Sequence, residues 1–263
     1  MCNCAVRGLR IAAAVVTALV VATGVAAPAS AGVWRSAPPN ANRLVTNEYA
    51  YWNPSLSDAV RSPVWEMNSG SLFAHRTTAG PAFWTGRVDD RAPNRLSSNG
   101  TNAAVFRLTT LRSNFRNVNV RMRLYVNGMS ATASTPPTDW DGVHLFLRYQ
   151  AEDSLYYASV ARRDGHIVLK KKCRGGPSNG GTYHTLAEKS GYRIPVRKWR
   201  YVSAGATTVV GGKVRLSLAI GDRVVLTALD SGVGCAPIRT MGKLGVRGDN
   251  TNFYFQQFQA RSA

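Results

Sequence analysis

Apolar and polar residues alternate in short runs along most of this 263-residue chain, and turn-forming residues separate the runs. Because successive side chains of a β-strand point to opposite faces, each run predicts a strand with one buried face. No long stretch has the 3.6-residue period of an amphipathic helix. The predicted strands span residues 104–111, 117–126, 142–150, 154–162, 166–173, 200–210, 213–220, 223–230, 243–249 and 252–260. Regularly spaced short strands of this kind favour an all-β sandwich.

The same period assigns each side chain to a face. In 142–150 the predicted core residues are Val143, Leu145, Leu147 and Tyr149, and the outward residues are His144, Phe146, Arg148 and Gln150. In the next two strands the residues predicted to face outward include Tyr157, Ser159, His166, Lys170 and Lys172. Turn signals at 152–154 and 163–165 join these three strands, so we expect a meander whose outward residues share one surface.

The first 31 residues predict an export signal rather than folded structure. Arg7 and Arg10 precede an apolar run at 11–21, and small residues lead to a cleavage site after Ala31. This apolar run is shorter than a membrane span. We therefore expect a secreted, extracellular protein without membrane insertion. Its mature chain would consist of an irregular leader (32–47) and one sandwich domain (48–263).

Two cysteines remain after the signal is removed, Cys173 and Cys235. Cysteines of exported proteins usually pair, so we expect a disulfide between them. On the chain-entropy model, closing a loop of about sixty residues stabilises the fold by about 4 kcal/mol.

The mature chain is strongly basic, with 31 Lys and Arg against 14 Asp and Glu once the two signal arginines are removed. Such a balance predicts attraction to polyanions, including uronic-acid polysaccharides, teichoic acids, anionic membranes and nucleic acid. Affinity for an anionic cell wall would explain it equally well, and charge alone does not choose between these partners.

Four segments in order resemble concanavalin A-like jelly rolls of the laminin-G-like kind. They are residues 65–86, 139–172, 198–230 and 242–259, and the resemblance covers roughly residues 48–260. It implies a two-sheet antiparallel jelly-roll sandwich with one concave face. In this superfamily that face binds carbohydrate, and in several enzyme families it cleaves it. The resemblance places strand 142–150 in the concave sheet.

The outward face of the meander is therefore a candidate groove. It carries His, Arg, Gln, Phe and Tyr, which suit stacking and hydrogen bonding to sugars, although the outer face of any antiparallel sheet is polar. The residues expected to bind substrate are Arg121, Arg123, His166, Lys170, Tyr183 and His184. Tyr183 and His184 lie in a Gly-rich segment (173–192) that is either a substrate-contacting loop or a plain surface loop.

Three functions fit such a groove. A glycoside hydrolase needs two facing carboxylates, and the ExDxxE pattern of jelly-roll glucanases is absent. A polysaccharide lyase would neutralise a uronate with Arg148 and Gln150, and Tyr157 or His144 would take the proton. The lyase motifs QIH and YxKxGxYxQ are absent, and Tyr is a poor base unless cations lower its pKa.

A polysaccharide binder needs the fewest assumptions, so we place it first and the lyase second. The expected partner is an anionic polysaccharide rather than nucleic acid, because aromatic platforms are not evident around the basic residues 162–174. There is no Cys/His metal spacing, and Asp139, Asp141 and 248–250 read as turns more readily than as a calcium site. We expect no cofactor and a monomer.

Overall fold

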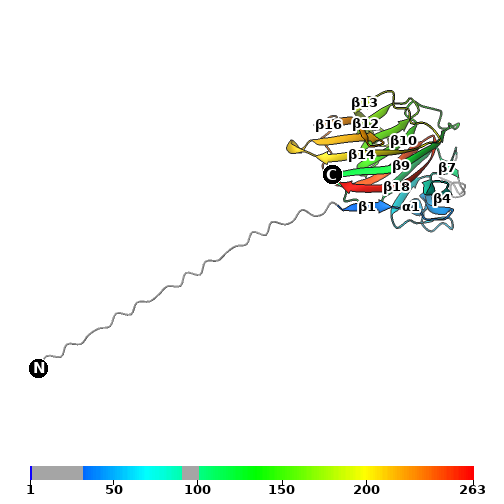
Figure 1. Cartoon of the computed structure of the whole chain (residues 1–263), viewed down its shortest axis with the longest axis horizontal. Helices are drawn as coiled ribbons and strands as arrows, with labels where there is room; N and C mark the ends of the chain where they lie inside the picture. Colours follow the sequence, from blue (N-terminus) through cyan, green and yellow to red (C-terminus); the bar gives the residue numbers. More distant parts are fainter. Residues whose placement is uncertain (2–31, 91–100) are drawn as a thin grey trace. The chain divides into compact units, whose positions relative to one another are not determined.

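Strands make up most of the computed structural model, which describes Met1, residues 32–90 and residues 101–263 (Figure 1). Side chains are described in the last range from residue 104 onward. Apart from Met1, the predicted export signal lies outside the described residues. Among the described residues, no helix is both long enough and apolar enough to cross a membrane.

The larger sheet, here sheet A, runs in the order β16-β15-β14-β9-β18-β5-β4-β2, and β1 also pairs with β18. All of its pairs are antiparallel. Its strands are β1 (Val33–Ser36), β2 (Arg43–Asn47), β4 (Ser71–Thr77), β5 (Gly80–Trp84), β9 (Val118–Met129), β14 (Trp199–Thr208), β15 (Val214–Ile220), β16 (Arg223–Asp230) and β18 (Thr251–Ser262).

The smaller sheet, sheet B, is also antiparallel and runs in the order β13-β12-β11-β10-β17-β8-β3. Its strands are β3 (Trp65–Ser69), β8 (Val105–Thr110), β10 (Gly142–Ala151), β11 (Ser154–Arg162), β12 (Ile167–Ser178), β13 (Gly181–Lys189) and β17 (Lys243–Asp249). The remaining elements are the parallel pair β6 (Arg87–Asp89) and β7 (Thr101–Ala103), helix α1 (Glu48–Trp52) and the 3-10 turn η2 (Val210–Gly212).

The core lies between the two sheets. Every second residue of β9 contributes to it, and so do Leu145 and Leu147 of β10, and none of these side chains is appreciably exposed. Burying each such aliphatic side chain stabilises the fold by about 1.5–3 kcal/mol. Two antiparallel sheets around one core form the predicted jelly-roll sandwich, and the predicted meander is confirmed as β10-β11-β12. The predicted disulfide is also present, joining Cys173 of β12 to Cys235 beyond the end of β16.

Two predicted irregular segments are strands instead. The leader supplies β1 and β2, because Trp34 packs its ring edge-on against Trp65, Phe115 and Phe258 at 5.6–6.0 Å between ring centroids. The segment 173–192, predicted as a loop, continues β12 to Ser178 and returns as β13. The first error arises from contacts of Trp34 with distant residues, whereas in the second the Gly-rich segment forms a local hairpin of β12 with β13.

A bulge near the end of β10 overturns two face predictions. Arg148 has φ 48°, and the pairing of β10 with both neighbours shifts between Phe146 and Ala151. One extra residue reverses the alternation beyond it. Tyr149, predicted in the core, stacks on Phe146 at 5.5 Å on the outer face of sheet B.

Arg148, predicted on the groove face, is buried on the opposite side of the sheet. Its guanidinium donates to the carbonyls of Arg116 and Ile238, each at 2.7 Å. It also donates to Asn117 Oδ1 at 3.2 Å and Thr208 Oγ1 at 3.0 Å. The side chain therefore ties β10 to β14 and to two connecting segments.

The Arg148→Ala substitution removes these four donors and leaves buried carbonyls without a partner. We expect it to lower the free energy of unfolding by about 3 kcal/mol. Urea denaturation followed by fluorescence measures this loss. The matched control is Gln150→Ala, two residues along at an exposed position, which we expect to change stability by about 0.5 kcal/mol or less. Equal losses in both variants would contradict the structural role of Arg148.

Candidate functional site

A pocket of ≈ 340 Å³ opens on the outer face of sheet B. Four adjacent or near-adjacent strands line it, β13, β12, β11 and β17, together with neighbouring loops. We call it the sheet B pocket. Its lining residues are Trp140, Tyr157, Ser159, Lys170, Lys172, Ser178, Asn179, Tyr183, Arg247 and Asp249.

Strand register brings the central residues together. Tyr157 of β11 lies opposite Lys170 of β12, and Lys172 lies opposite Tyr183 of β13. The rings of Tyr157 and Tyr183 are 5.5 Å apart, and the Lys172 ammonium lies 4.9 Å from the centre of the Tyr183 ring. Period-two alternation therefore concentrates two lysines and two tyrosines in one small area.

The two lysines are held in a partly dehydrated environment. Burial, together with the nearby Arg247 and Arg107 charges, lowers the pKa of Lys172 to about 8, although Glu152 and Asp153 oppose this change. Burial also lowers the pKa of Lys170. Within the described residues, neither ammonium forms an ion pair with a carboxylate. Both charges therefore remain uncompensated by the protein itself.

Asp249, in contrast, is paired with a cation of the protein. Arg247 donates to both of its carboxylate oxygens at 2.7–3.0 Å, and His144 Nε2 lies 3.3 Å from Oδ2. Although burial opposes ionisation, the Arg247 charge holds the pKa of Asp249 well below its usual range. This carboxylate is therefore an acceptor for hydroxyl groups and not a proton donor.

His144 lies beneath the pocket rather than in it. Its ring stacks on Tyr157 at 4.5 Å, and Nδ1 lies 3.0 Å from Ser159 Oγ. The side chain has no exposed surface, and burial lowers its pKa despite the neighbouring Asp249. His144 thus supports Tyr157 and Asp249 from behind, which differs from its predicted place on the ligand-facing surface.

Of the residues predicted for the groove, Tyr157, Lys170 and Tyr183 line the sheet B pocket. Gln150 does not, because it lies past the bulge and donates to the Met241 carbonyl at 2.9 Å. His166 stands outside the lining with its Nδ1 2.7 Å from Glu188. His184, next to Tyr183, points to the other side of β13 and packs against the backbone at Gly234.

Arg121 and Arg123 are on a different sheet. Both belong to β9 of sheet A, so the expectation that they share a surface with Tyr157 is wrong. Arg121 lies over the Tyr201 ring and pairs with Asp222, and Arg123 lies over Trp199. Alternation correctly gave their outward direction but contains no information on which sheet a strand joins.

Sequence reasoning missed Lys172, Arg247, Asp249 and Trp140 as site residues. Alternation in 243–249 would have put Arg247 and Asp249 on one face. However, β17 lies 80 residues or more from its neighbour β10, and nothing local indicates that the two strands pair.

The pocket lacks the parts of a glycoside hydrolase. Asp249 is the one carboxylate among the described residues that line it, whereas hydrolysis uses two. Burial raises the pKa of Tyr157 well above its ordinary value, which is opposite to the change that a base would need. Asp141, a candidate calcium ligand, instead caps a turn through Thr138 and accepts from Asn250 at 3.1 Å.

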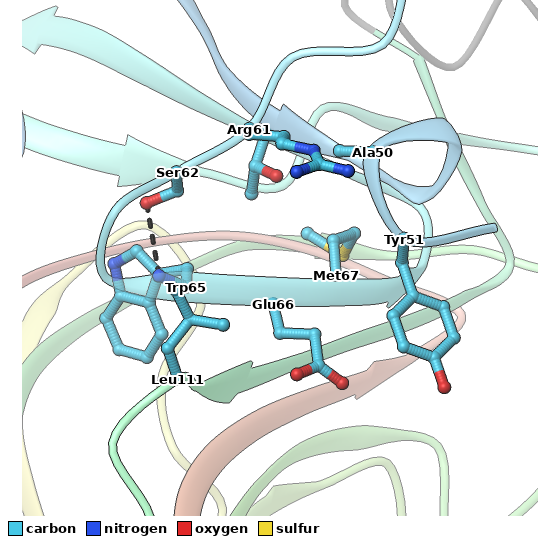
Figure 2. A pocket seen from close by; sticks show the side chains of 9 residues that line it. Ala50, Tyr51, Arg61, Ser62, Trp65, Glu66, Met67 and Leu111 are labelled. Carbon is cyan, nitrogen blue, oxygen red and sulfur yellow. Dashed lines mark hydrogen bonds between the residues drawn. The ribbon is translucent and has the colours of Figure 1, made fainter. Parts of the chain in front are cut away.

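A second hollow of ≈ 300 Å³ lies beside α1 and β3 (Figure 2). Glu66 is the single carboxylate among its described lining residues, and it pairs with Lys243 at 2.6 Å. At the other end, Ser62 Oγ accepts from the Trp65 backbone at 3.1 Å. This hollow has one lining cation, Arg61, where the sheet B pocket has three, so the sheet B pocket is the stronger candidate.

The comparisons with known proteins agree with the fold. No family model matches the chain, and no curated protein matches it. A Bacillus subtilis protein of unknown function with a galectin-like fold superposes with a TM-score of 0.50 and 14% identity, over 75% of this chain and 89% of that chain.

Two further solved structures are similar at lower scores. The carbohydrate-binding module CBM66 from Bacillus subtilis has a TM-score of 0.49 and 14% identity, over 75% of this chain and 95% of that chain. The Bacillus licheniformis β-glucanase has a TM-score of 0.42 and 8% identity, over 77% and 94%. At these identities the likeness concerns the fold alone.

Lys172→Met removes an unpaired buried charge, so we expect it to stabilise the free protein by about 1–3 kcal/mol at pH 7. The folded-state pKa of Lys172, about 8, is below its ordinary value of 10.5. At pH values between the two, the unfolded chain therefore binds more protons than the folded protein. Wild-type stability therefore rises with pH across this window, and the advantage of the variant shrinks. Urea denaturation of both proteins from pH 7 to 10.5 measures this difference. A variant less stable than the wild type at pH 7 would contradict the expected unpaired charge.

Proposed function

We propose that this protein is a secreted polysaccharide-binding protein that holds an anionic glycan in the sheet B pocket. The observation that carries the proposal is the pair Lys170 and Lys172, two dehydrated cations without a carboxylate partner beside Tyr157 and Tyr183. The sequence resemblance implies a carbohydrate ligand.

An anion bound here would offset the free-energy cost of burying the ammonium groups of Lys170 and Lys172. A buried ammonium without a counter-ion is unfavourable, and a carboxylate or sulfate placed between Lys170 and Lys172 removes that penalty. Tyr157 and Tyr183 offer ring faces for stacking and hydroxyls for hydrogen bonding. Asp249 offers oxygens that accept from sugar hydroxyls. The pocket therefore matches a ligand that is both negatively charged and rich in hydroxyl groups.

A polysaccharide lyase is the second candidate, and one observation favours it. Lys172, with a pKa of about 8, has the character of a general base near neutral pH. The raised pKa of Tyr157 suits a proton donor. We place the binder first because Arg148 and Gln150, the predicted uronate-neutralising pair, lie away from the pocket.

Affinity electrophoresis through gels containing polygalacturonate, alginate, a sulfated glycan or a neutral glucan tests the proposal. We expect a polyuronate to retard the wild type and Lys172→Met to weaken this binding about tenfold. The matched control is Lys213→Met, which removes the same charge from an exposed position just before β15. If both substitutions weakened binding equally, net charge alone would explain the loss, which would contradict a specific site at Lys172.

Ultraviolet absorbance and reducing ends, followed together on the same polymers, separate the candidates. If the protein binds a polymer and neither absorbance nor reducing ends rise, the result supports a binder. If both rise, and Lys172→Met abolishes the rise, the protein is a lyase instead.

The affinity of the wild type for the polyuronate depends on the Lys172 proton. Because the free-protein pKa is about 8, Lys172 loses its charge as the pH rises through this value, and the anion loses a partner. We expect affinity to fall about tenfold from pH 7 to pH 10 at constant ionic strength. Isothermal titration calorimetry measures the decline. The same decline in Lys172→Met would assign the effect to another group.

A further inference from the structure

An unbroken row of aromatic side chains crosses the outer face of sheet A. Cross-strand pairing places one such residue on each of five adjacent strands, in direct register. The row consists of Phe73 (β4), Trp84 (β5), Tyr254 (β18), Tyr125 (β9) and Trp199 (β14). The strand order places these five strands next to one another, and Figure 1 shows β14, the green β9 and the red β18 side by side. We call this set the aromatic row.

Successive rings of the aromatic row are in contact. Their centroids are 5.6, 5.7, 5.9 and 5.2 Å apart, taken from Phe73 to Trp199. Four strand spacings of about 4.8 Å make the row about 19 Å long. Each step is similar to the repeat of one pyranose ring in an extended glycan. Apart from the buried Phe73, these side chains are half-exposed.

The rings are held in place before any ligand binds. Trp84 Nε1 donates to Asn252 Oδ1 at 2.8 Å, and Arg123 lies over the Trp199 ring at 5.0 Å. His75 adds a further ring, 5.6 Å from Tyr254. A platform whose rotamers are already fixed loses little conformational entropy on binding.

A hollow of ≈ 320 Å³ lies alongside the row, lined in part by His75, Tyr125, Trp199 and Tyr254. Within the described residues, the Tyr125 and Tyr254 hydroxyls and Trp199 Nε1 make no hydrogen bond to protein. These groups are available to sugar hydroxyls at the edge of ring faces. A solvated outer face of a sheet would carry polar side chains here instead.

Two arginines near the row are already engaged, in contrast to Lys170 and Lys172. Arg121 pairs with Asp222 at 2.9 Å, and Arg76 donates to the Asn40 carbonyl at 3.0 Å. The row itself consists of mostly half-exposed aromatic rings and tyrosine hydroxyls rather than charged groups, which matches a neutral ligand.

We propose that the aromatic row is a second binding surface, for an extended chain of neutral pyranose sugars. The row and the sheet B pocket are on different sheets and share no residue, so this proposal stands whether or not the sheet B pocket binds an anion. If both are correct, one molecule joins a neutral and an acidic polymer.

Affinity electrophoresis with soluble neutral β-glucan, β-mannan and α-glucan, each at 50 and 500 mM NaCl, tests the row. We expect at least one neutral polymer to retard the wild type equally at both salt concentrations, because no charge pair forms. Trp199→Ala should weaken this binding about tenfold or more. Lys172→Met should leave it unchanged, which separates this site from the proposed anion site.

The matched control is Trp52→Ala, which removes an exposed indole (61% exposed) from outside the row. Tyr125→Phe, which keeps the ring and removes the hydroxyl, should retain most of the affinity if stacking dominates. Three results would overturn the proposal: no neutral polymer binds, Trp52→Ala weakens binding as much as Trp199→Ala, or sedimentation shows Trp199-dependent self-association in place of glycan binding.

Discussion

A buried network of Lys171, Asp230 and Tyr156 fixes the pairing on which the rest of sheet B depends. Lys171 Nζ lies 2.9 Å from the Asp230 carboxylate, Tyr156 donates to it at 2.6 Å, and none of the three is exposed. Lys171 and Tyr156 are direct partners on β12 and β11, and Asp230 ends β16 of the other sheet. A register slip of one residue would bury a lysine without a counter-ion, which costs several kcal/mol. The residues next to this network, Tyr157, Lys170 and Lys172, must therefore face outward.

The two outer faces consequently have different chemistry. On sheet B, alternation delivers two lysines to a pocket in which neither forms an ion pair with a carboxylate of the described residues, and the nearby Arg247 and Asp249 pair with each other. On sheet A, Arg121 pairs with Asp222, and the outer face carries the aromatic row. We propose that the first face binds an anion and the second binds uncharged sugar rings. The strongly basic composition alone would not have separated these two surfaces.

The local sequence pattern correctly predicted those features of the fold that depend on backbone geometry alone. Alternation gave the strands, the core face of β9, and the outward directions of Tyr157 and Lys170, because a period of two depends only on backbone geometry. It failed at Arg148, where a left-handed residue inserts a bulge, and so also misplaced Tyr149. It could not assign Arg123 to sheet A or bring Arg247 beside Tyr157. Sheet membership and strand order are set by contacts between residues far apart in the chain, and these leave no local periodicity.

The central claim is that Lys172 is a charged group that lacks a partner until an anion binds. Nuclear magnetic resonance of the lysine side chains, titrated with pH in the absence and presence of an oligogalacturonate, tests it most directly. The account predicts that Lys172 titrates near pH 8 in the free protein, below the ordinary 10.5, and moves upward when the oligosaccharide is added. A Lys172 that titrates near 10.5 and does not respond to the oligosaccharide would contradict the account.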